Sequence, residues 1–489
     1  MSRVIVLGAG VSGHTSAAFL RKWLGKEHDV VVVAPKPDYN WIPSNIWVGV
    51  GLLAKKKVIT PLAPIYDRNG IEFHLAKAVS IHPQGRMGNG APAKGPFVTI
   101  EYTGGPQAGK TEELTYDFLV NATGPKLKFE ATPGLGPDGG HSFSVCTEDH
   151  AEETARDLAE RIERMRRGET QRFVIGTGHG QCTCQGAAFE YIVNLEFELR
   201  AKRVRDKAEI IWLSNEFELG DFGMGGMHIL RNGYITPSKI FAESLYAERG
   251  LDWITRAHVQ EVREGELSYE TLAGEQRDLK FDSAMLLPPF SGVGLTALDR
   301  EGNLITDQVF APNGFMKVDA DYTSKPFEDW KASDWPRNYQ SPTFENLFAA
   351  GIAFAPPHAI SRPRSSPKGT PIFPTPPRTG MPSATIGKAV AKSIVGIMKE
   401  MGGQLAEASM AEMGAACVAS AGANPFTGTA ASMTVYPIVP DFERYPEYGR
   451  DLKYTFGEIG LAGHWIKILL HHMFLYKARM RPFWSLIPE

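Results

Sequence analysis

Cysteine is scarce in this sequence, with four residues in a chain of 489. So few cysteines exclude the disulfide framework that stabilises small secreted domains. A charge bias is also lacking: the formal net charge is −3, which gives no electrostatic reason to expect nucleic acid as a partner. Uncharged apolar runs of about 18 residues are missing, so no spanning helix is predicted. The N-terminus shows no signal-peptide pattern, and we expect none.

The composition is that of an ordinary globular protein, with 43% hydrophobic and 22% charged residues. A chain of this length exceeds a single hydrophobic core, so two large domains and an appendage are expected.

The first forty residues carry a dinucleotide-binding fingerprint. Gly8, Gly10 and Gly13 form a G-x-G-x-x-G motif between an apolar strand at residues 4–7 and a helix at residues 14–24. These glycines let the backbone approach a pyrophosphate at the positive end of the helix. The alternative is tight packing of a strand on a helix. The position of the motif favours a nucleotide cofactor.

A second strand–turn–helix pattern, at residues 172–198, departs from the fingerprint. Gly176 and Gly178 occupy the first two glycine positions, but Gln181 takes the third, and the loop carries Cys182 and Cys184. The pattern predicts a Rossmann-like domain that does not hold a nicotinamide cofactor tightly. The loop presents sulfur instead.

Two cysteines lie where a helix is expected to begin. Cys184 precedes the second helix, and Cys146 precedes Thr147, a candidate N-cap, with His150 one turn further on. A helix N-terminus lowers the pKa of a thiol, and a histidine there can lend positive charge or move protons. The alternative is an inert, buried cysteine. A zinc or iron–sulfur site is disfavoured because no second ligand pair follows His179, Cys182 and Cys184, and we predict no metal.

The C-terminal segment combines apolar, aromatic and basic residues. Residues 460–480 include Trp465, Leu469, Lys467 and Lys477, and aromatic residues follow at 483 and 484. This mixture is typical of a helix that lies in the headgroup region of a membrane. A helix docked on the core or on a second subunit is the alternative.

The order of the motifs resembles the sulfide:quinone oxidoreductases, flavoproteins with two dinucleotide-binding domains. The resemblance extends over nearly the whole chain, and Asp221 and Arg378 depart from the family pattern, which identifies a divergent branch. The motifs that carry it are the N-terminal fingerprint, Asn121-Ala122-Thr123-Gly124-Pro125, Ser144-Val145-Cys146-Thr147, residues 184–190, residues 287–290, residues 346–351, Arg378-Thr379-Gly380 and Cys417.

The resemblance implies FAD as the cofactor and a set of residues around it. Cys184 and Cys417 would form the redox-active pair beside the flavin, and Cys182 is a neighbour that could trade roles with Cys184. The remaining residues implied for the reaction are Cys146, Glu190 and His150. Those implied for cofactor binding are Gly8, Gly10, Gly13, Ala122, Thr123, Gly124, Gly351 and Arg378.

The expected fold class is α/β, with two Rossmann-like domains and a membrane-associating C-terminal segment. The flavin domain is expected to be discontinuous, residues 1–128 and 303–385, with the second domain at 129–302. Residues 386–489 would hold Cys417 and interfacial amphipathic helices.

The implied activity is oxidation of sulfide to polysulfide or sulfur, with a membrane quinone as electron acceptor. A type II NADH:quinone oxidoreductase and a non-enzymatic flavin-bearing sulfur carrier are the alternatives. We expect a peripheral protein of the cytoplasmic membrane, on a side that the sequence leaves open, and homo-oligomer formation is a further open alternative.

Overall fold

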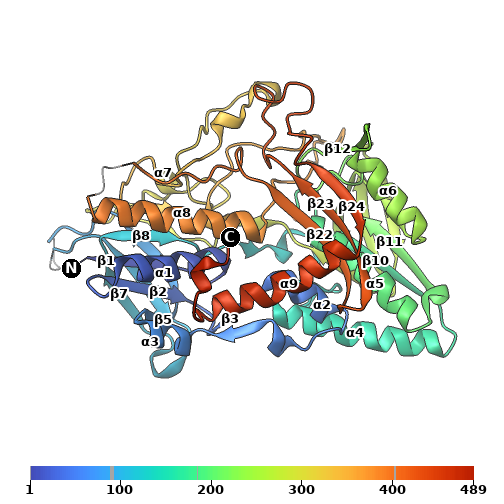
Figure 1. Ribbon diagram of the computed structural model, residues 1–489, viewed down its shortest axis with the longest axis horizontal. Helices are drawn as coiled ribbons and strands as arrows, with labels where there is room; N and C mark the ends of the chain where they lie inside the picture. The colour runs from blue at the N-terminus through green and yellow to red at the C-terminus, as the bar shows by residue number, and fades with distance from the viewer. Residues whose placement is uncertain (1, 89–92, 184, 401–403) are drawn as a thin grey trace.

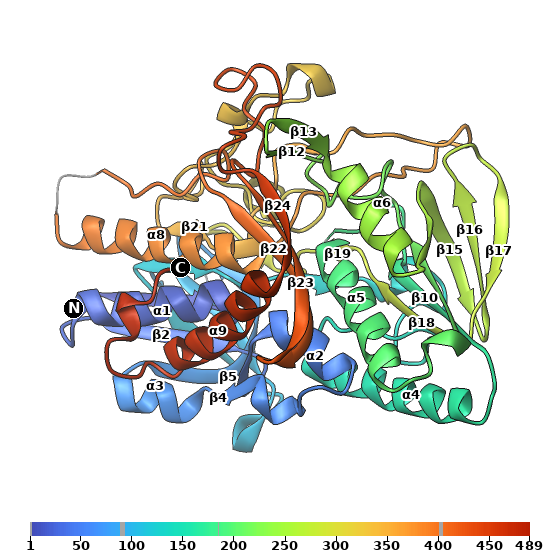
Figure 2. The same cartoon turned by 45° about the vertical axis from the view of Figure 1, so that its right-hand side comes forward.

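The computed structural model describes residues 2–88, 93–183, 185–400 and 404–489. Two parallel sheets with helices around them lie at the two ends of the molecule, and a smaller antiparallel sheet lies between them (Figures 1 and 2). The mixed α/β architecture that the sequence predicts is therefore confirmed.

The first sheet has eight strands, six of them parallel. Its order is β21 (Leu347–Ala349), β8 (Phe118–Asn121), β1 (Arg3–Leu7), β2 (Asp29–Ala34), β5 (Glu72–His82), β6 (Phe97–Tyr102) and β7 (Thr111–Thr115), with β20 (Thr296–Ala297) paired to β5. The helices α1 (Val11–Leu24) and α8 (Gly380–Met398) pack against each other along one face. The strands β1 and β2 are buried apolar runs, as parallel strands covered by helices require.

The second parallel sheet has four strands, in the order β14 (Asp252–Ile254), β11 (Ala208–Leu213), β10 (Gln171–Thr177) and β18 (Ser283–Leu287). The helices α4 (Glu148–Arg166) and α5 (Gln185–Ala201) pack on β10. Thr147 caps α4 as predicted, because its Oγ1 accepts a hydrogen bond from the amide of His150 at 3.1 Å.

The C-terminal region contains a three-stranded antiparallel sheet that the sequence analysis did not foresee. The strands are β22 (Ala415–Asn424), β23 (Thr427–Val435) and β24 (Phe456–Gly460), and α9 (Leu461–Ala478) packs on them. The helix α5 packs against β22, so the C-terminal region contacts the middle of the chain. The helix α8 runs across the domain boundary predicted at residue 385 and packs on α1. The limits of the domains stay a prediction.

The helix α9 has the reverse of the usual pattern. Its buried residues include His464, Lys467 and His471, whereas Trp465 and Leu469 are more than half exposed. A helix that docks on a protein core normally buries its apolar side chains. In the first three turns of α9 the polar side therefore faces the protein and the apolar side is on the surface, whereas Leu475 and Ala478 near its end are buried.

A buried arginine ties the C-terminal region to the second domain. The Arg450 guanidinium donates hydrogen bonds of 2.7 Å to the carbonyl oxygens of Met224 and Gly226, and further bonds to Pro437 and Ile438. The buried carboxyl group of Asp221 supplies the nearby negative charge. Asp221 itself accepts hydrogen bonds from the Gly223 amide and the Ser361 hydroxyl.

We expect Arg450→Met to destabilise the protein by about 3–5 kcal/mol, because the variant leaves a buried carboxylate and four carbonyl oxygens without their cation. Arg444→Met, at an exposed position nearby, should change stability by less than about 0.5 kcal/mol. Chemical denaturation of the two variants measures the difference. Equal midpoints for both variants would contradict this structural role.

Candidate active site

The predicted flavin-binding residues converge at one edge of the first sheet. The strands β1, β8 and β21 are parallel, so their carboxyl ends meet beside the N-terminus of α1. The Ala122 amide donates to the Leu7 carbonyl oxygen at 2.8 Å, and the Ala350 amide donates to the Asn121 carbonyl oxygen at 2.9 Å. These bonds bring the segments that follow the three strands together.

The glycines of the fingerprint have two different roles. A Cβ atom at Gly8 would lie 2.2 Å from the Ala122 carbonyl oxygen, and one at Gly13 would lie 2.1 Å from the Gly8 carbonyl oxygen. A Cβ atom at Gly10 or Gly124 would meet nothing within 4 Å. Gly8 and Gly13 therefore allow close packing, whereas Gly10 and Gly124 border open space.

This cradle fits the pyrophosphate of FAD. No side chain caps the N-terminus of α1, and its first turn holds no acidic residue. The amide groups there are consequently available to an anion.

Gly351, Arg378 and Thr123 complete this edge. Gly351 follows β21 with a positive φ of 63°, and a Cβ atom there would clash with the Ser12 hydroxyl. Arg378 donates to the carbonyl oxygens of Ile352 and Phe354 at 2.7 and 3.1 Å. The Thr123 hydroxyl donates to the Asn121 side chain at 2.8 Å.

The corresponding loop of the second parallel sheet uses its own amide groups internally. The Gly178 amide donates to the Leu287 carbonyl oxygen, and the Gly180 amide donates to Nδ1 of His258, both at 2.8 Å. The Gln181 amide donates to Nδ1 of His179 at 3.1 Å. Amide groups engaged in this way cannot also hold a pyrophosphate.

The proline-rich segment covers the same loop. The Phe373 amide donates to the Gly180 carbonyl oxygen at 2.9 Å, and the Thr375 amide donates to the Cys182 carbonyl oxygen at 3.0 Å. The Thr183 hydroxyl donates to the Pro376 carbonyl oxygen at 2.8 Å. Extended chain therefore lies where a second nucleotide would approach.

Cys417 lies against the first turn of α5. A Cβ atom at Gly186 would be 3.1 Å from its Sγ atom. Cys184 lies outside the described residues, two positions before Gly186 in the sequence. Burial, followed by the Glu190 carboxylate, raises the pKa of Cys417 to about 12, because a thiolate would lose its hydration at this interface.

Cys182 is fully buried. Its thiol donates to the Leu287 carbonyl oxygen at 3.1 Å, on the neighbouring strand β18. This environment favours a structural role over exchange with Cys184. No group of three or more His, Cys, Asp or Glu within the described part of the chain could hold a metal ion.

Cys146 and His150 lie at the start of α4. Cys146 is half-buried, and its amide donates to the Ser144 hydroxyl at 3.1 Å. Nε2 of His150 is 3.7 Å from the Asp138 carboxylate. Burial lowers the pKa of His150, with Asp138 opposing the shift, so the neutral imidazole is favoured. The suggestion that His150 lends positive charge to Cys146 is thus not supported, and its part in the reaction stays a prediction.

Glu190 forms a buried ion pair that the sequence analysis missed. Lys467 Nζ on α9 lies 2.9 Å from Glu190 Oε2, and the Ser420 amide on β22 donates to Oε1 at 3.5 Å. Burial raises the pKa of Glu190, and the charge of Lys467 opposes this shift. Lys467 lies 277 positions from Glu190 in the sequence. Because it belongs to an apolar C-terminal helix, we expected it at the membrane surface. Only the burial of a charged residue in that helix could have indicated the ion pair.

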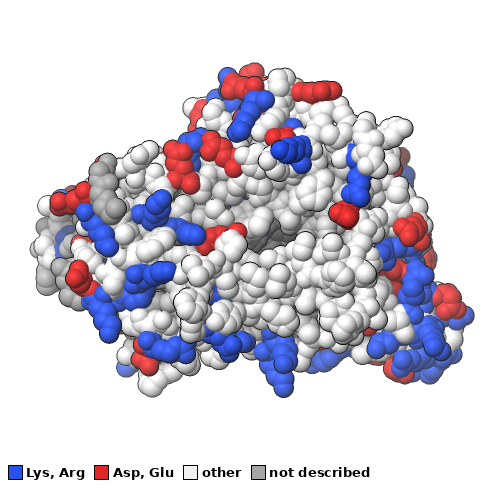
Figure 3. Space-filling model, viewed as in Figure 1, with Lys and Arg blue, Asp and Glu red and all other residues white. Residues whose placement is uncertain are grey.

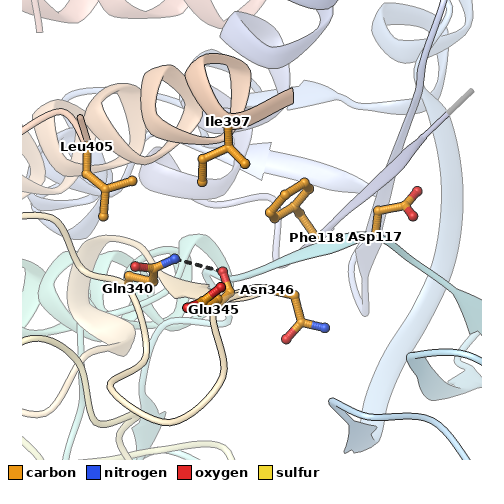
Figure 4. Close-up of a pocket in the computed structure, with 7 residues that line it drawn as sticks. All are labelled: Asp117, Phe118, Gln340, Glu345, Asn346, Ile397 and Leu405. Carbon is orange, nitrogen blue, oxygen red and sulfur yellow. Dashed lines mark hydrogen bonds between the residues drawn. The ribbon is translucent and has the colours of Figure 1, made fainter. Parts of the chain in front are cut away.

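A hollow of about 420 Å³ lies away from this site. Figure 4 shows Asp117 and Phe118 on one side and Gln340 on the other, with Ile397 and Leu405 above. It borders the amino end of β8, whereas the cradle lies at the carboxyl end of that strand. The hollow therefore does not belong to the flavin site.

Comparison with known proteins agrees with the motifs. No family model matches the chain. The chain is 28% identical to a sulfide-quinone reductase from Aquifex aeolicus, over 97% of this chain and 91% of the relative. A solved sulfide:quinone oxidoreductase from the same organism superposes with a TM-score of 0.73 and 27% identity, over 98% of this chain and 92% of the other.

A more distant relative is an external alternative NAD(P)H-ubiquinone oxidoreductase from Arabidopsis thaliana, 25% identical over 54% of this chain and 43% of the relative. The full-length matches confirm the predicted resemblance to the sulfide:quinone oxidoreductases, and with it FAD as the cofactor.

The two kinds of glycine predict two different phenotypes. Gly8→Ala should prevent stable folding, because its Cβ would clash with backbone and its φ of +100° is unfavourable for alanine. Gly10→Ala should leave the apoprotein folded but weaken FAD binding, since its methyl group enters open space that the cofactor needs. Circular dichroism and flavin titration of both variants measure this. Normal flavin affinity in Gly10→Ala would contradict the assigned cradle.

Proposed function

We propose that this chain is a sulfide:quinone oxidoreductase that oxidises sulfide through FAD and passes the electrons to a quinone. The observation that carries the proposal is the position of Cys417 Sγ at Gly186, beside the loop that bears Cys184 in the sequence. A redox pair formed by residues 184 and 417 requires this approach. The likeness to the Aquifex aeolicus enzyme along the whole chain supports it.

The sulfur chemistry needs two cysteines and an electron acceptor. Hydrosulfide attacks one sulfur of a bridge between Cys184 and Cys417, which leaves a persulfide on one cysteine and a thiolate on the other. FAD, when bound, would accept the two electrons released as the persulfide and the thiolate rejoin in a longer bridge, and would pass them to quinone. Each further hydrosulfide attacks this bridge and adds one sulfur atom, until the chain leaves as polysulfide or sulfur.

Glu190 is placed to move protons during these steps. It lies one turn after Gly186 on α5, and residues four apart share one face of a helix. The carboxylate therefore faces the same interface as Cys417, and its charge acts on that thiol. Cys146 and His150 would act at the edge of the site as sulfur-handling and acid–base groups.

An NADH:quinone oxidoreductase is disfavoured by the loop at residues 176–184. Its amide groups are engaged with His258, His179 and Leu287, and the segment at residues 371–377 covers it. A sulfur carrier without turnover would not need a quinone.

The exposed side of α9 supports contact with a membrane. Leu461, Trp465, Ile466 and Leu469 are each 46–56% exposed on this helix, which we call the α9 face. Figure 3 shows a broad uncharged area over this part of the molecule, with Lys and Arg side chains along its lower edge and a hollow above it. Apolar and basic groups in this arrangement suit the headgroup region.

Membrane contact of this kind would give the site access to quinone. No helix in the described residues is long and apolar enough to cross a membrane. A second copy of the chain covering the α9 face is the alternative. The side of the cytoplasmic membrane on which the protein acts stays open.

We expect Cys417→Ser and Cys184→Ser each to lower sulfide-dependent quinone reduction by about a thousandfold or more, because either change prevents the bridge. Anaerobic reduction of the flavin by sulfide, followed by addition of quinone, measures both half-reactions. Cys182→Ala is the matched control and should retain turnover if the protein folds, because this buried thiol donates to the Leu287 carbonyl oxygen and takes no part in the proposed bridge.

NADH should not reduce the flavin of the wild-type protein. Near-normal turnover in either single variant would remove the basis of the proposal, and rapid reduction by NADH would favour the alternative. Multiple turnovers with excess quinone would exclude a stoichiometric sulfur carrier.

The double variant Ile466→Glu/Leu469→Glu should bind anionic vesicles about 100-fold more weakly, because two exposed apolar side chains contribute roughly 3 kcal/mol when buried in lipid. Leu304→Glu, at an exposed position outside α9, should bind as the wild type does. Co-sedimentation measures binding, and size-exclusion chromatography measures the oligomeric state. Unchanged vesicle binding together with loss of a dimer would instead assign the α9 face to a second copy.

A further inference from the structure

The buried ion pair between α9 and α5 requires an explanation. The side chains of Lys467 and Glu190 are 11% and 8% exposed, and their charged atoms are 2.9 Å apart. Removing two charges from water costs several kcal/mol per ion, so such a pair is a poor source of stability. A role in the reaction would account for its presence.

The pair adjoins the surface where α5 meets β22. Glu190 accepts from the Ser420 amide on β22, and Asn194, one turn further along α5, donates to the Ser420 carbonyl oxygen at 2.7 Å. One turn earlier, Gly186 contacts Cys417 Sγ on the same strand. The carboxylate and the sulfur therefore occupy neighbouring positions of one interface.

We propose that Lys467 is a positioning residue that keeps Glu190 ionised, so that its carboxylate can accept the proton of the Cys417 thiol. The inference rests on the proposed function. In this step the proton leaves Sγ and binds a carboxylate oxygen, which converts a thiol and a carboxylate into a thiolate and a carboxylic acid. The total charge of the cluster is unchanged.

The electrostatics of the site agree with this role. Burial raises the pKa of Glu190, and Lys467 is the cation that opposes the shift. A neutral side chain at position 467 would remove this opposing charge. Burial would then raise the pKa of Glu190 further, and its carboxyl group would hold a proton up to a higher pH. A protonated Glu190 cannot accept a second proton from the thiol.

Other titratable groups also lie around the pair. Burial raises the pKa of Tyr246 on α6 (Ser238–Glu248), which faces Cys417, far above its usual range. Burial lowers the pKa of His471 on α9 to about 4. His464 on α9 is bonded to the Ser420 hydroxyl at 2.7 Å and to the Asn424 carbonyl oxygen at 2.8 Å. The strands β22 and β23 contain no charged residue or histidine.

The test is the pH dependence of sulfide oxidation in Lys467→Met. Removal of the cation should raise the pKa of Glu190, so the loss of rate at acidic pH should begin about 1–3 pH units higher than in the wild type. The rate of the variant divided by that of the wild type is the useful quantity, because the titration of sulfide itself cancels. A ratio that does not change with pH would overturn the proposal.

Two lysine variants control for the loss of charge and of packing. Lys467→Arg keeps the charge and should restore the wild-type profile. Lys477→Met removes the other buried, ion-paired lysine of α9, whose partner is Glu489 at 2.6 Å. In this variant the pH at which the rate begins to fall on the acidic side should be that of the wild type. An equal shift in Lys477→Met would show that any buried lysine of this helix has the same effect and would also overturn the proposal.

If Lys467→Met does not fold, the double variant Glu190→Gln/Lys467→Met takes its place. This variant lacks both charges, so it leaves no lone buried ion. It should have the rate and the pH profile of Glu190→Gln alone, because Lys467 acts through Glu190. Independent, additive losses from the two changes would contradict this dependence.

Infrared difference spectroscopy tests the protonation of Glu190 without sulfide or quinone. Near neutral pH, Lys467→Met should show a protonated carboxyl band that the wild type lacks and that disappears in the double variant. Presence of this band in a protein that fails to oxidise sulfide would retain the inference and refute the proposed function. Absence of the band in a folded Lys467→Met would refute the inference alone.

Discussion

The packing of β22 against the first turn of α5 is the contact on which the site depends. Gly186 leaves room for Cys417 Sγ beside the helix, because even a Cβ atom at that position would lie only 3.1 Å from the sulfur. The same contact buries Glu190 and aligns its carboxylate with the strand. A sulfur atom, a carboxylate and the loop of the second parallel sheet are thus brought together by one helix–strand interface.

The local parts of this arrangement could be predicted from the sequence. The fingerprint of Gly8, Gly10 and Gly13 requires only a strand, a turn and a helix that are adjacent in the chain, and the cap at Thr147 is equally local. The C-terminal sheet could not be predicted, because β22 is rich in alanine, glycine and serine, which have low strand propensity. Its pairing is established by tertiary contacts.

The ion pair of Lys467 and Glu190 was missed for a related reason. A lysine within an apolar C-terminal helix predicts a charge at the membrane surface, and the exposed Trp465 and Leu469 agree with that interpretation. The structure shows that the two sides differ in the first three turns of α9: the apolar side is on the surface, and the polar side faces α5 and β22. The same amphipathic sequence pattern therefore fits a helix whose apolar side faces the protein and a helix whose apolar side faces outward. Only the contacts that each side makes decide between these two orientations.

The raised pKa of Cys417 makes removal of its proton a requirement for its sulfur chemistry. The thiolate is the reactive form in sulfur exchange, and a thiol with a pKa of about 12 supplies little thiolate at neutral pH. The Glu190 carboxylate faces the same interface, where it accepts a hydrogen bond from the Ser420 amide and acts on that thiol. Burial of Cys417 beside Glu190 therefore places the sulfur atom next to a group that can accept its proton.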